Sequence, residues 1–393
     1  MAATQVMLSD DLLARCAERA AGYDRENRFF QEDFDELKEA GYLTVAVPEE
    51  FGGRGMKLDA VCREQRRLAY HAAPTALAVN MHLYWTGVAA DLRRAGDTSL
   101  EWLLTEAADG AVFAAGHAES GNDLPVLLST SKARRVEGGY VFTGHKSFGS
   151  LTPVWTYLGL HAMDTSDPEA PKVVHAFLPR DADGIEVRST WDDVLGMRAT
   201  RSDDTILDEA FIPDRYVARV QPAGFAGADA FVLGIFAWAL LGFGNVYYGL
   251  ARRILDMTLD RLRDKKSIAI ASGSLSRHPG IQSDVADMWI ELERIGPHLD
   301  RIAGEWSQGV DHGHGWVPKI FSAKHSAVEG AWRVADKALD VAGGFGIFPA
   351  SGIERLVRDA RIGRLHPSNA YLTREVVAKS VLGLNPAEPP RWG

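Results

Sequence analysis

Residues 138–144 read GGYVFTG, and the alternation of apolar and polar side chains in this stretch decides the fold class of the chain. A period of two is typical of a β-strand, and the two glycines in front of it mark a turn. The same pattern, bounded by Gly, Pro or Asp, recurs in residues 155–163, 172–179, 184–190 and 204–213. The sequence therefore predicts an antiparallel β-domain in the middle of the chain, which we place at residues 113–225.

Helical periodicity flanks this β-domain on both sides. Before it, apolar residues recur three and four positions apart in residues 10–23, 29–42, 58–73 and 100–109. After it, long helical patterns continue to about Leu384. Because helices, then strands, then helices indicate segregated layers, we predict an α+β fold. It has an N-terminal helical domain (1–112), the middle β-domain (113–225) and a C-terminal four-helix bundle (226–393).

The composition is typical of a soluble globular protein, with 46% hydrophobic and 24% charged residues. The formal net charge is −10 and no basic run stands out, which argues against a nucleic-acid partner. Cys16 and Cys62 are too few for a disulfide framework, and neither has a Cys or His at metal spacing, so we expect no metal site. The first residues lack a basic start followed by an apolar core, which favours a cytoplasmic protein.

Residues 230–251, AFVLGIFAWALLGFGNVYYGLA, contain no charged residue and are long enough to span a bilayer. Four glycines in this stretch suit close helix packing, and it continues directly into the amphipathic residues 252–266. A helix that is covered on all sides, in part by another subunit, is also apolar all round. We therefore expect a buried helix and no membrane partner.

Four motifs, in the expected order, resemble the acyl-CoA dehydrogenase superfamily over nearly the whole chain. Residues 34–55 are similar to its N-terminal signature, residues 139–150 to the strand and turn that face the flavin, residues 195–213 to the strand pair that closes the β-domain, and residues 338–362 to the C-terminal flavin-binding turn and helix. The resemblance implies an acyl-CoA dehydrogenase-like fold, FAD or FMN as cofactor, and a homotetramer or dimer.

The same resemblance implies a set of flavin contacts. Ser150 takes the position of the hydroxyl that binds near flavin N5, and Phe148 that of the tryptophan that supports the ring. A flavin also needs backbone amides for its phosphates. The candidates for these and for the remaining cofactor contacts, several of which depart from the family's residues, are Gly116, Asn122, Lys265, Asp340, Gly343, Gly344, Gly346 and Asn369.

The catalytic carboxylate of the family is missing. Dehydrogenation needs a Glu with a raised pKa to remove an α-proton. In the family this Glu lies eight residues after the Asp of the RDA motif, where this chain has Pro367. In a minority of members it lies on the long buried helix, where this chain has Ala239, and the Arg beside it corresponds to Leu240. These three residues are instead expected to line the substrate pocket.

His366 directly precedes the position of the missing Glu. The superfamily also contains two-component monooxygenases that act on phenols, indoles or thiophenes with reduced flavin and oxygen. Some have a similar LHDP-like segment together with a serine near N5, and His366 and Ser150 match that pairing. Because an imidazole gives or takes a proton near neutral pH, we predict these two as the catalytic residues. In the alternative, His366 only caps a helix through its backbone, with Pro367 in the first turn.

Three functions remain open. The first, slightly favoured, is a monooxygenase that uses reduced flavin and O₂ on an apolar (aromatic or acyl) substrate. Its reduced flavin would come from a separate flavin reductase. The second is an acyl-CoA dehydrogenase, with a non-standard base or as the base-less subunit beside a Glu-bearing homologue. The third is a non-catalytic flavin-binding scaffold. A pocket lined by residues 236–241 and approached by Trp155, His82 or Tyr84 would be apolar, although each of these three side chains also suits a core.

Overall fold

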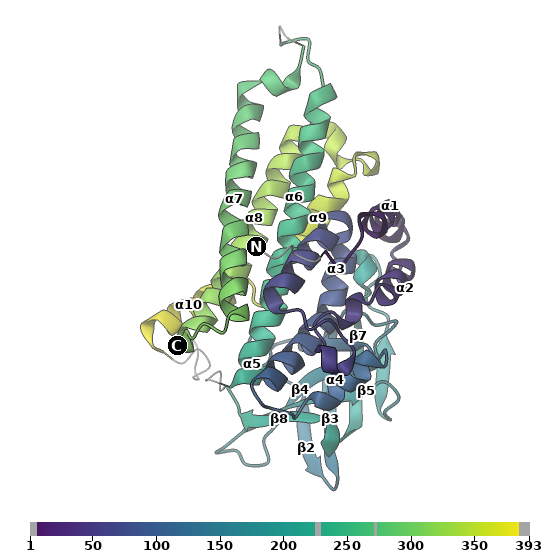
Figure 1. Ribbon diagram of the computed structural model, residues 1–393, viewed down its shortest axis with the longest axis vertical. Coiled ribbons are helices and arrows are strands. Elements are labelled where there is room, and N and C mark those ends of the chain that lie inside the picture. Colours follow the sequence, from purple (N-terminus) through teal and green to yellow (C-terminus); the bar gives the residue numbers. More distant parts are fainter. Residues whose placement is uncertain (1–5, 225–228, 271–272, 385–393) are drawn as a thin grey trace.

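A computed structural model describes residues 6–224, 229–270 and 273–384 of the chain, and its elements follow the predicted order (Figure 1). The N-terminal helices are α1 (Asp10–Glu26), α2 (Gln31–Glu39), α3 (Leu58–Arg94) and α4 (Glu101–Ala108). The strands are β1 (Phe113–Gly116), β2 (Lys132–Val136), β3 (Gly139–Gly149), β4 (Tyr157–Asp164), β5 (Lys172–Pro179), β6 (Ile185–Arg188), β7 (Asp203–Pro213) and β8 (Val217–Pro222). The C-terminal helices are α5 (Ala230–Ile235), α6 (Leu241–Asp264), α7 (Pro279–Ser307), α8 (Trp316–Ala342), α9 (Ile353–Gly363) and α10 (Ala370–Leu382). The predicted α+β fold is confirmed, while the boundary predicted between residues 225 and 226 lies outside the described residues.

The sheet is mixed, which corrects the prediction of an antiparallel β-domain. Antiparallel pairs join β3 to β2 and β7, β5 to β4 and β8, and β6 to β7. However, β1 runs parallel to β4, with Phe113 opposite Tyr157, and Lys132 of β2 lies opposite Met163 of β4 in a parallel pair. The β2–β3 hairpin separates β1 from β4 in the sequence. Local periodicity reports which residues form strands but not the direction of such distant pairs.

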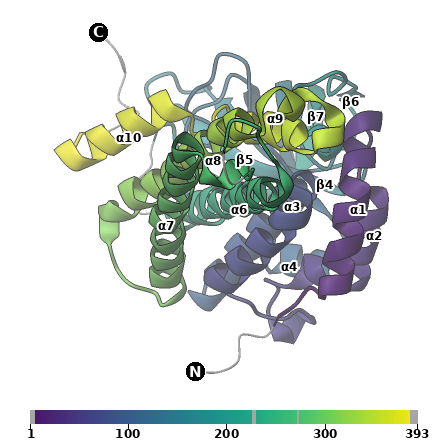
Figure 2. The ribbon, with the colours of Figure 1, turned by 90° about the horizontal axis from the view of Figure 1, so that it is seen from above.

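The apolar stretch at residues 230–251 lies at the centre of the helical part. It forms α5, a π-helical turn (Phe236–Leu240) and the first half of α6, and 89% of its most apolar 18-residue window is buried inside the protein. Figure 2 shows α6 with α3, α7, α8 and α9 around it. Glycines permit this close packing: a Cβ at Gly242 would lie 2.1 Å from the Asn80 side chain, and one at Gly249 2.3 Å from the Arg66 carbonyl. The helix is therefore apolar all round because other helices cover it.

Three side chains that the sequence analysis weighed as pocket or core residues are buried in the core. Trp155 and Tyr84 are buried. His82 is buried as well, and its ring joins two segments: Nδ1 accepts a hydrogen bond from the Phe113 amide at 3.1 Å, and Nε2 donates to the Leu43 carbonyl at 2.8 Å. Burial lowers the pKa of His82 to about 4, so this ring is a neutral structural bridge.

Candidate functional site

Ser150 lies at the end of β3, where two turns of unusual backbone meet. Phe148 and Leu151 have φ angles of 60° and 70°, and in the facing turn Met197 and Arg201 have φ angles of 54° and 43°. Such left-handed conformations cost a non-glycine residue about 1–3 kcal/mol, and they concentrate at functional sites. The Leu151 amide donates to the carbonyl of Thr200, the residue just before Arg201, at 3.2 Å. The two turns therefore hold each other in place.

These turns bring three buried hydroxyls into a row. The Oγ atoms of Ser150 and Ser202 are 2.7 Å apart, and Ser202 Oγ is 2.7 Å from Thr200 Oγ1. Thr200 Oγ1 in turn donates to the Met197 carbonyl at 2.8 Å. The sequence pointed to Ser150 but not to Ser202 or Thr200, because nothing in the pattern ATRSDD indicates that its hydroxyls reach a serine in another strand.

Phe148 presents its ring to the outside next to Ser150. The side chain is 61% exposed, although phenylalanine is usually buried, and its ring packs edge-to-face on Trp191 with 6.0 Å between centroids. An exposed aromatic on a strained backbone can support a flat ligand, as the sequence prediction for this residue requires.

His366 lies in the loop after α9, against the long helix α6. Its ring centroid is 5.2 Å from that of Phe243 and 5.8 Å from that of Tyr247. The Nε2 atom is buried and has no hydrogen-bond partner among the described residues. Burial, assisted by the charge of Lys324, lowers the pKa of His366 to about 3. The imidazole is therefore neutral at physiological pH, with one ring nitrogen available to a ligand.

Lys324 of α8 is a site residue that the sequence did not reveal. It is fully buried, and its Nζ donates to the carbonyl oxygens of His366 at 3.1 Å and Ser368 at 2.8 Å. Burial lowers its pKa to about 7. A lysine in the middle of a long amphipathic helix predicts a solvated side chain, whereas here it holds the loop that carries the imidazole.

The structure rejects the helix-cap alternative for His366. Helix α10 begins at Ala370, and its N-cap is Asn369, whose Oδ1 accepts from the amides of Tyr371 and Leu372 at 3.0 Å. Pro367 therefore lies before the helix and not in its first turn. Asn369, predicted as a cofactor contact, places its carbonyl oxygen in this cap, as helix-starting asparagines commonly do.

The predicted pocket residues separate into buried and exposed positions. Ala239 and Leu240 are buried in the π-helical turn, a local form that often occurs at functional sites. Pro367 is exposed. Two polar atoms on neighbouring helices are buried without hydrogen-bond partners in the described part of the chain. They are Tyr247 Oη on α6 and Asp359 Oδ2 on α9.

Asp359 connects the two halves of the site. Its Oδ1 accepts from the Met197 amide at 2.6 Å, so α9, which leads to His366, also anchors the turn that holds the hydroxyl row. Burial raises the pKa of Asp359 to about 6. The RDA motif thus joins the Ser150 side to the His366 side through a single carboxyl group.

The glycine turn after α8 borders a cavity of about 400 Å³, which is also lined by Lys265, Arg261 and Phe345. Gly343 ends the helix with φ 64° and ψ −161°, a conformation open only to glycine. Lys265 Nζ donates to the Ala342 carbonyl at 2.9 Å. Around the same end of α8, Asp340 and Gly344 are exposed and Gly346 is buried.

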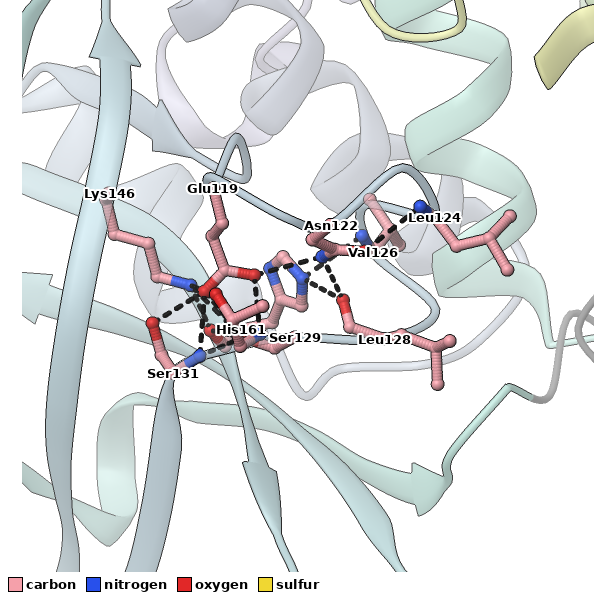
Figure 3. Close-up of polar contacts among 10 residues, drawn as sticks. Glu119, Asn122, Leu124, Val126, Leu128, Ser129, Ser131, Lys146 and His161 are labelled. Carbon is pink, nitrogen blue, oxygen red and sulfur yellow. Dashed lines mark hydrogen bonds and ion pairs between the residues drawn. The ribbon is translucent and has the colours of Figure 1, made fainter. Parts of the chain in front are cut away.

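The loop between β1 and β2 is organised around a buried ion pair between Glu119 and Lys146 (Figure 3). Glu119 accepts from Lys146 Nζ at 2.6 Å, and although burial opposes it, the charge of Lys146 lowers the pKa of Glu119 to about 2. Asn122 gives both amide hydrogens to the protein, to Glu119 at 2.9 Å and to the Leu128 carbonyl at 2.6 Å. Gly116 ends β1 and is buried. Of the two predicted cofactor residues, Asn122 thus has a structural task inside the loop, while Gly116 lies at the end of the strand that precedes it.

Comparison with known proteins assigns both helical parts of the chain. Residues 5–99 match the acyl-CoA dehydrogenase N-terminal domain and residues 231–382 the acyl-CoA dehydrogenase C-terminal domain. The putative acyl-CoA dehydrogenase YdbM of Bacillus subtilis is 27% identical over 352 residues, covering 88% of each chain. L-evernosamine nitrososynthase of Micromonospora sp. is 25% identical over 393 residues, covering 97% of this chain and 90% of that protein.

A solved structure shares the whole fold. KijD3, in complex with FMN and a dTDP-linked amino sugar, superposes with a TM-score of 0.85 at 23% identity and covers 99% of this chain and 96% of that one. The described side chains fit a flavin: a hydroxyl at the end of β3, an exposed aromatic beside it, and an unpartnered imidazole nitrogen on the helical side.

Proposed function

Because this chain belongs to the acyl-CoA dehydrogenase family of flavin-dependent oxidoreductases, we propose that it is the oxygenase component of a two-component flavin monooxygenase. One observation carries the proposal. Both positions at which the family places its catalytic Glu are occupied by Ala239 and Pro367, while the neighbouring His366 offers a buried nitrogen that no group among the described residues uses.

Each of the site's side chains has a role that follows from its surroundings. The flavin, when bound and reduced, supplies the two electrons that activate oxygen. Ser150 would hold the flavin near N5 and Phe148 would support its ring. His366 is neutral because burial lowers its pKa, so its unpartnered ring nitrogen would accept a hydrogen bond from an N–H or O–H group of the substrate. Electrons arrive from a separate flavin reductase, which is the partner that we propose.

The site suits FMN better than FAD. Lys265, the cation at the position of the family's adenosine-side Arg, already donates to the carbonyls of Ala342 and Val341 at the end of α8. Asp340 places an exposed carboxylate beside the glycine turn, where it repels a second phosphate. Both features weaken a pyrophosphate contact and leave a mononucleotide as the preferred ligand.

The substrate is an apolar molecule that carries an ionisable N–H or O–H group. The π-helical turn (Phe236–Leu240) supplies an apolar wall, and neutral His366 supplies a hydrogen-bond acceptor. N-oxygenation, the reaction type suggested by the nitrososynthase relative, needs the amine in its neutral form, and an acceptor of this kind would bind and orient its N–H group.

We also propose that the protein assembles as a dimer or tetramer of identical subunits. Large apolar side chains, among them Phe345, which lines the cavity, and the nearby Ile347 and Phe348, are more than half exposed in one subunit. Contiguous exposed apolar surface of this kind marks protein interfaces. Light scattering that gives the mass of a stable flavin-bound monomer would reject this assembly.

Stopped-flow spectroscopy tests the reaction. The reduced, FMN-loaded protein is mixed with oxygenated buffer, and we expect a transient absorbance that belongs neither to oxidised nor to reduced flavin. His366→Ala should reduce turnover by roughly 10²–10⁴-fold and leave flavin affinity nearly unchanged. Anaerobic bleaching of the oxidised flavin by an acyl-CoA thioester would instead establish a dehydrogenase, and bleaching only after addition of a Glu-bearing homologue would establish the heteromer.

A further inference from the structure

The row of hydroxyls at Ser150 has a fixed direction. Each hydroxyl carries one hydrogen, and a carbonyl oxygen only accepts. Thr200 uses its hydrogen on the Met197 carbonyl at 2.8 Å, so Ser202 must donate to Thr200 across their 2.7 Å contact. Ser150 must then donate to Ser202, also at 2.7 Å. The hydrogen of Ser150 therefore points into the protein, and its lone pairs point outward.

The end of this row cannot easily reverse. Asp359 holds the Met197 amide at 2.6 Å, and the Met197 carbonyl also accepts from the indole nitrogen of Trp191 at 3.3 Å. The carbonyl is thereby fixed as the last acceptor of the chain. Both turns that carry the hydroxyls contain left-handed non-glycine residues, and four of the eight such residues in the described part of the chain flank this row. Strain concentrated in this way indicates a built arrangement rather than incidental packing.

We propose that Thr200 and Ser202 are positioning residues that fix Ser150 as a hydrogen-bond acceptor, so that this site binds reduced flavin in preference to oxidised flavin. The inference rests on the proposed function, which places flavin N5 at Ser150. Reduced flavin carries a hydrogen on N5 and can donate it to Ser150. Oxidised flavin has only a lone pair on N5, which then faces the lone pairs of Ser150.

This preference gives the oxygenase a way to exchange its flavin. Reduced flavin from the reductase is bound with an additional hydrogen bond to Ser150. Ser150 would lose this hydrogen bond once the flavin is oxidised and has no N5 hydrogen, so the site would release oxidised flavin for its next reduction. A two-component enzyme needs this asymmetry because its flavin travels between two proteins.

The test is a pair of dissociation constants, for oxidised FMN and for dithionite-reduced FMN under anaerobic conditions. The wild-type protein should bind the reduced form more tightly. In Thr200→Val the hydroxyl at the end of the row is lost, Ser202 is free to donate to Ser150, and Ser150 is free to donate to oxidised N5. In Ser202→Ala, Ser150 is freed directly. Both variants should lower the ratio of the oxidised to the reduced constant by roughly three- to tenfold, mainly through tighter binding of the oxidised form.

Thr200→Ser is the matched control, because it keeps the hydroxyl and should keep the wild-type ratio. Circular dichroism identifies a variant that fails to fold, and the second variant then decides. An unchanged ratio in a folded Thr200→Val or Ser202→Ala protein would overturn the inference and leave the proposed oxygenase intact. A wild-type protein that binds FMN but gives only acyl-CoA-dependent bleaching would overturn the proposed function, whereas the ratio in the variants would still report on the hydroxyl row.

Discussion

Two lysines are buried among the described residues, and their partners differ. Lys146 of β3 is paired with the Glu119 carboxylate at 2.6 Å, while Lys324 of α8 has only carbonyl oxygens, at 2.8 and 3.1 Å. Burial lowers the pKa of Lys146 to about 8 and that of Lys324 to about 7. The charge of Lys146 is balanced by the carboxylate of Glu119, whereas the charge of protonated Lys324 faces only carbonyl oxygens and lowers the pKa of its neighbour His366.

The β-domain lysine should therefore matter for stability alone. Lys146→Met leaves the buried carboxylate of Glu119 without its cation, and breaking a buried pair on one side costs about 3–5 kcal/mol of unfolding free energy. Urea denaturation measures the loss, and turnover per folded molecule should be unchanged. The double variant Lys146→Met with Glu119→Gln removes both charges and should recover part of the stability. No recovery in the double variant would mean that packing, not charge, sets the cost.

The helical-bundle lysine should instead affect the chemistry. Lys324→Met removes the Nζ group and both of its hydrogen bonds to the His366 loop, and displacement of a catalytic group by about 1 Å reduces rates by up to about 10²-fold. We expect turnover to fall by roughly 10–100-fold, with a loss of stability of about 1.5–3 kcal/mol from the charged hydrogen bonds.

A pH profile separates positioning by Lys324 from simple destabilisation. Without the charge of Lys324 the pKa of His366 should rise, so the acidic limb of the rate profile should move to higher pH. Lys324→Gln keeps a neutral donor and should recover part of the rate but not the limb. If Lys324→Met lost stability and kept both its rate and its pH profile, the two lysines would have the same structural task.

The sequence predicted where the helices and strands lie, but not the direction of distant strands or the contacts of the buried lysines. Periodicity located the helices and strands, because burial of one face repeats every two or 3.6 residues. It did not report that β1 and β4 run parallel, since strand direction depends on distant pairing. Ser150 and His366 were predicted because they lie in motifs that resemble known ones, while the contacts of Lys324 were not predicted because its loop partners lie 42 and 44 residues away.

The hydroxyl row was hidden for the same reason. Ser202 and Ser150 are 52 residues apart in the chain, and small polar residues in a turn are common without any function. Asn369 and Asn122 show contacts that the sequence did not indicate. Their positions suggested cofactor contacts, which stay predictions, and in the structure one caps α10 and the other holds the loop around Glu119. Contacts of a short polar side chain are set by local backbone geometry, which a sequence pattern does not contain.

Neutral histidines near Lys146 provide a smaller test of how burial changes pKa values in the β-domain. His161 and His175 are buried in the β-domain with their rings stacked at 5.8 Å. Burial first, and then nearby cationic and histidine charges, lower the pKa of His175 to about 3, whereas an unfolded histidine titrates near pH 6.5. Between these values the unfolded chain binds a proton that the folded one does not, so stability is complete above about pH 6.5 and falls as the pH decreases.

Each such histidine contributes a slope of up to about 1.4 kcal/mol per pH unit. His175→Gln should therefore make the dependence of unfolding free energy on pH shallower by about this amount between pH 6 and pH 4. Urea denaturation at several pH values gives both slopes. An identical slope in the variant would show that His175 is already charged in the folded protein, and that burial does not keep this imidazole neutral in the β-domain.

The smallest effect concerns the backbone strain next to Ser150. Phe148 has φ 60° and is 61% exposed, whereas Phe211 in β7 is 40% exposed and is not among the residues with a positive φ. Glycine adopts positive φ without penalty, so Phe148→Gly gains relief of strain that offsets the entropy glycine loses on folding. Phe211→Gly has no strain to relieve and loses strand propensity as well. We expect the two variants to differ by about 1–2 kcal/mol in unfolding free energy, with Phe148→Gly the more stable.

Phe148→Gly should nevertheless bind FMN more weakly, because it removes the ring that supports the flavin, and Phe211→Gly should bind FMN as the wild type does. Equal losses of stability would mean that the turn is not strained, and the hydroxyl row would then depend on hydrogen bonds alone.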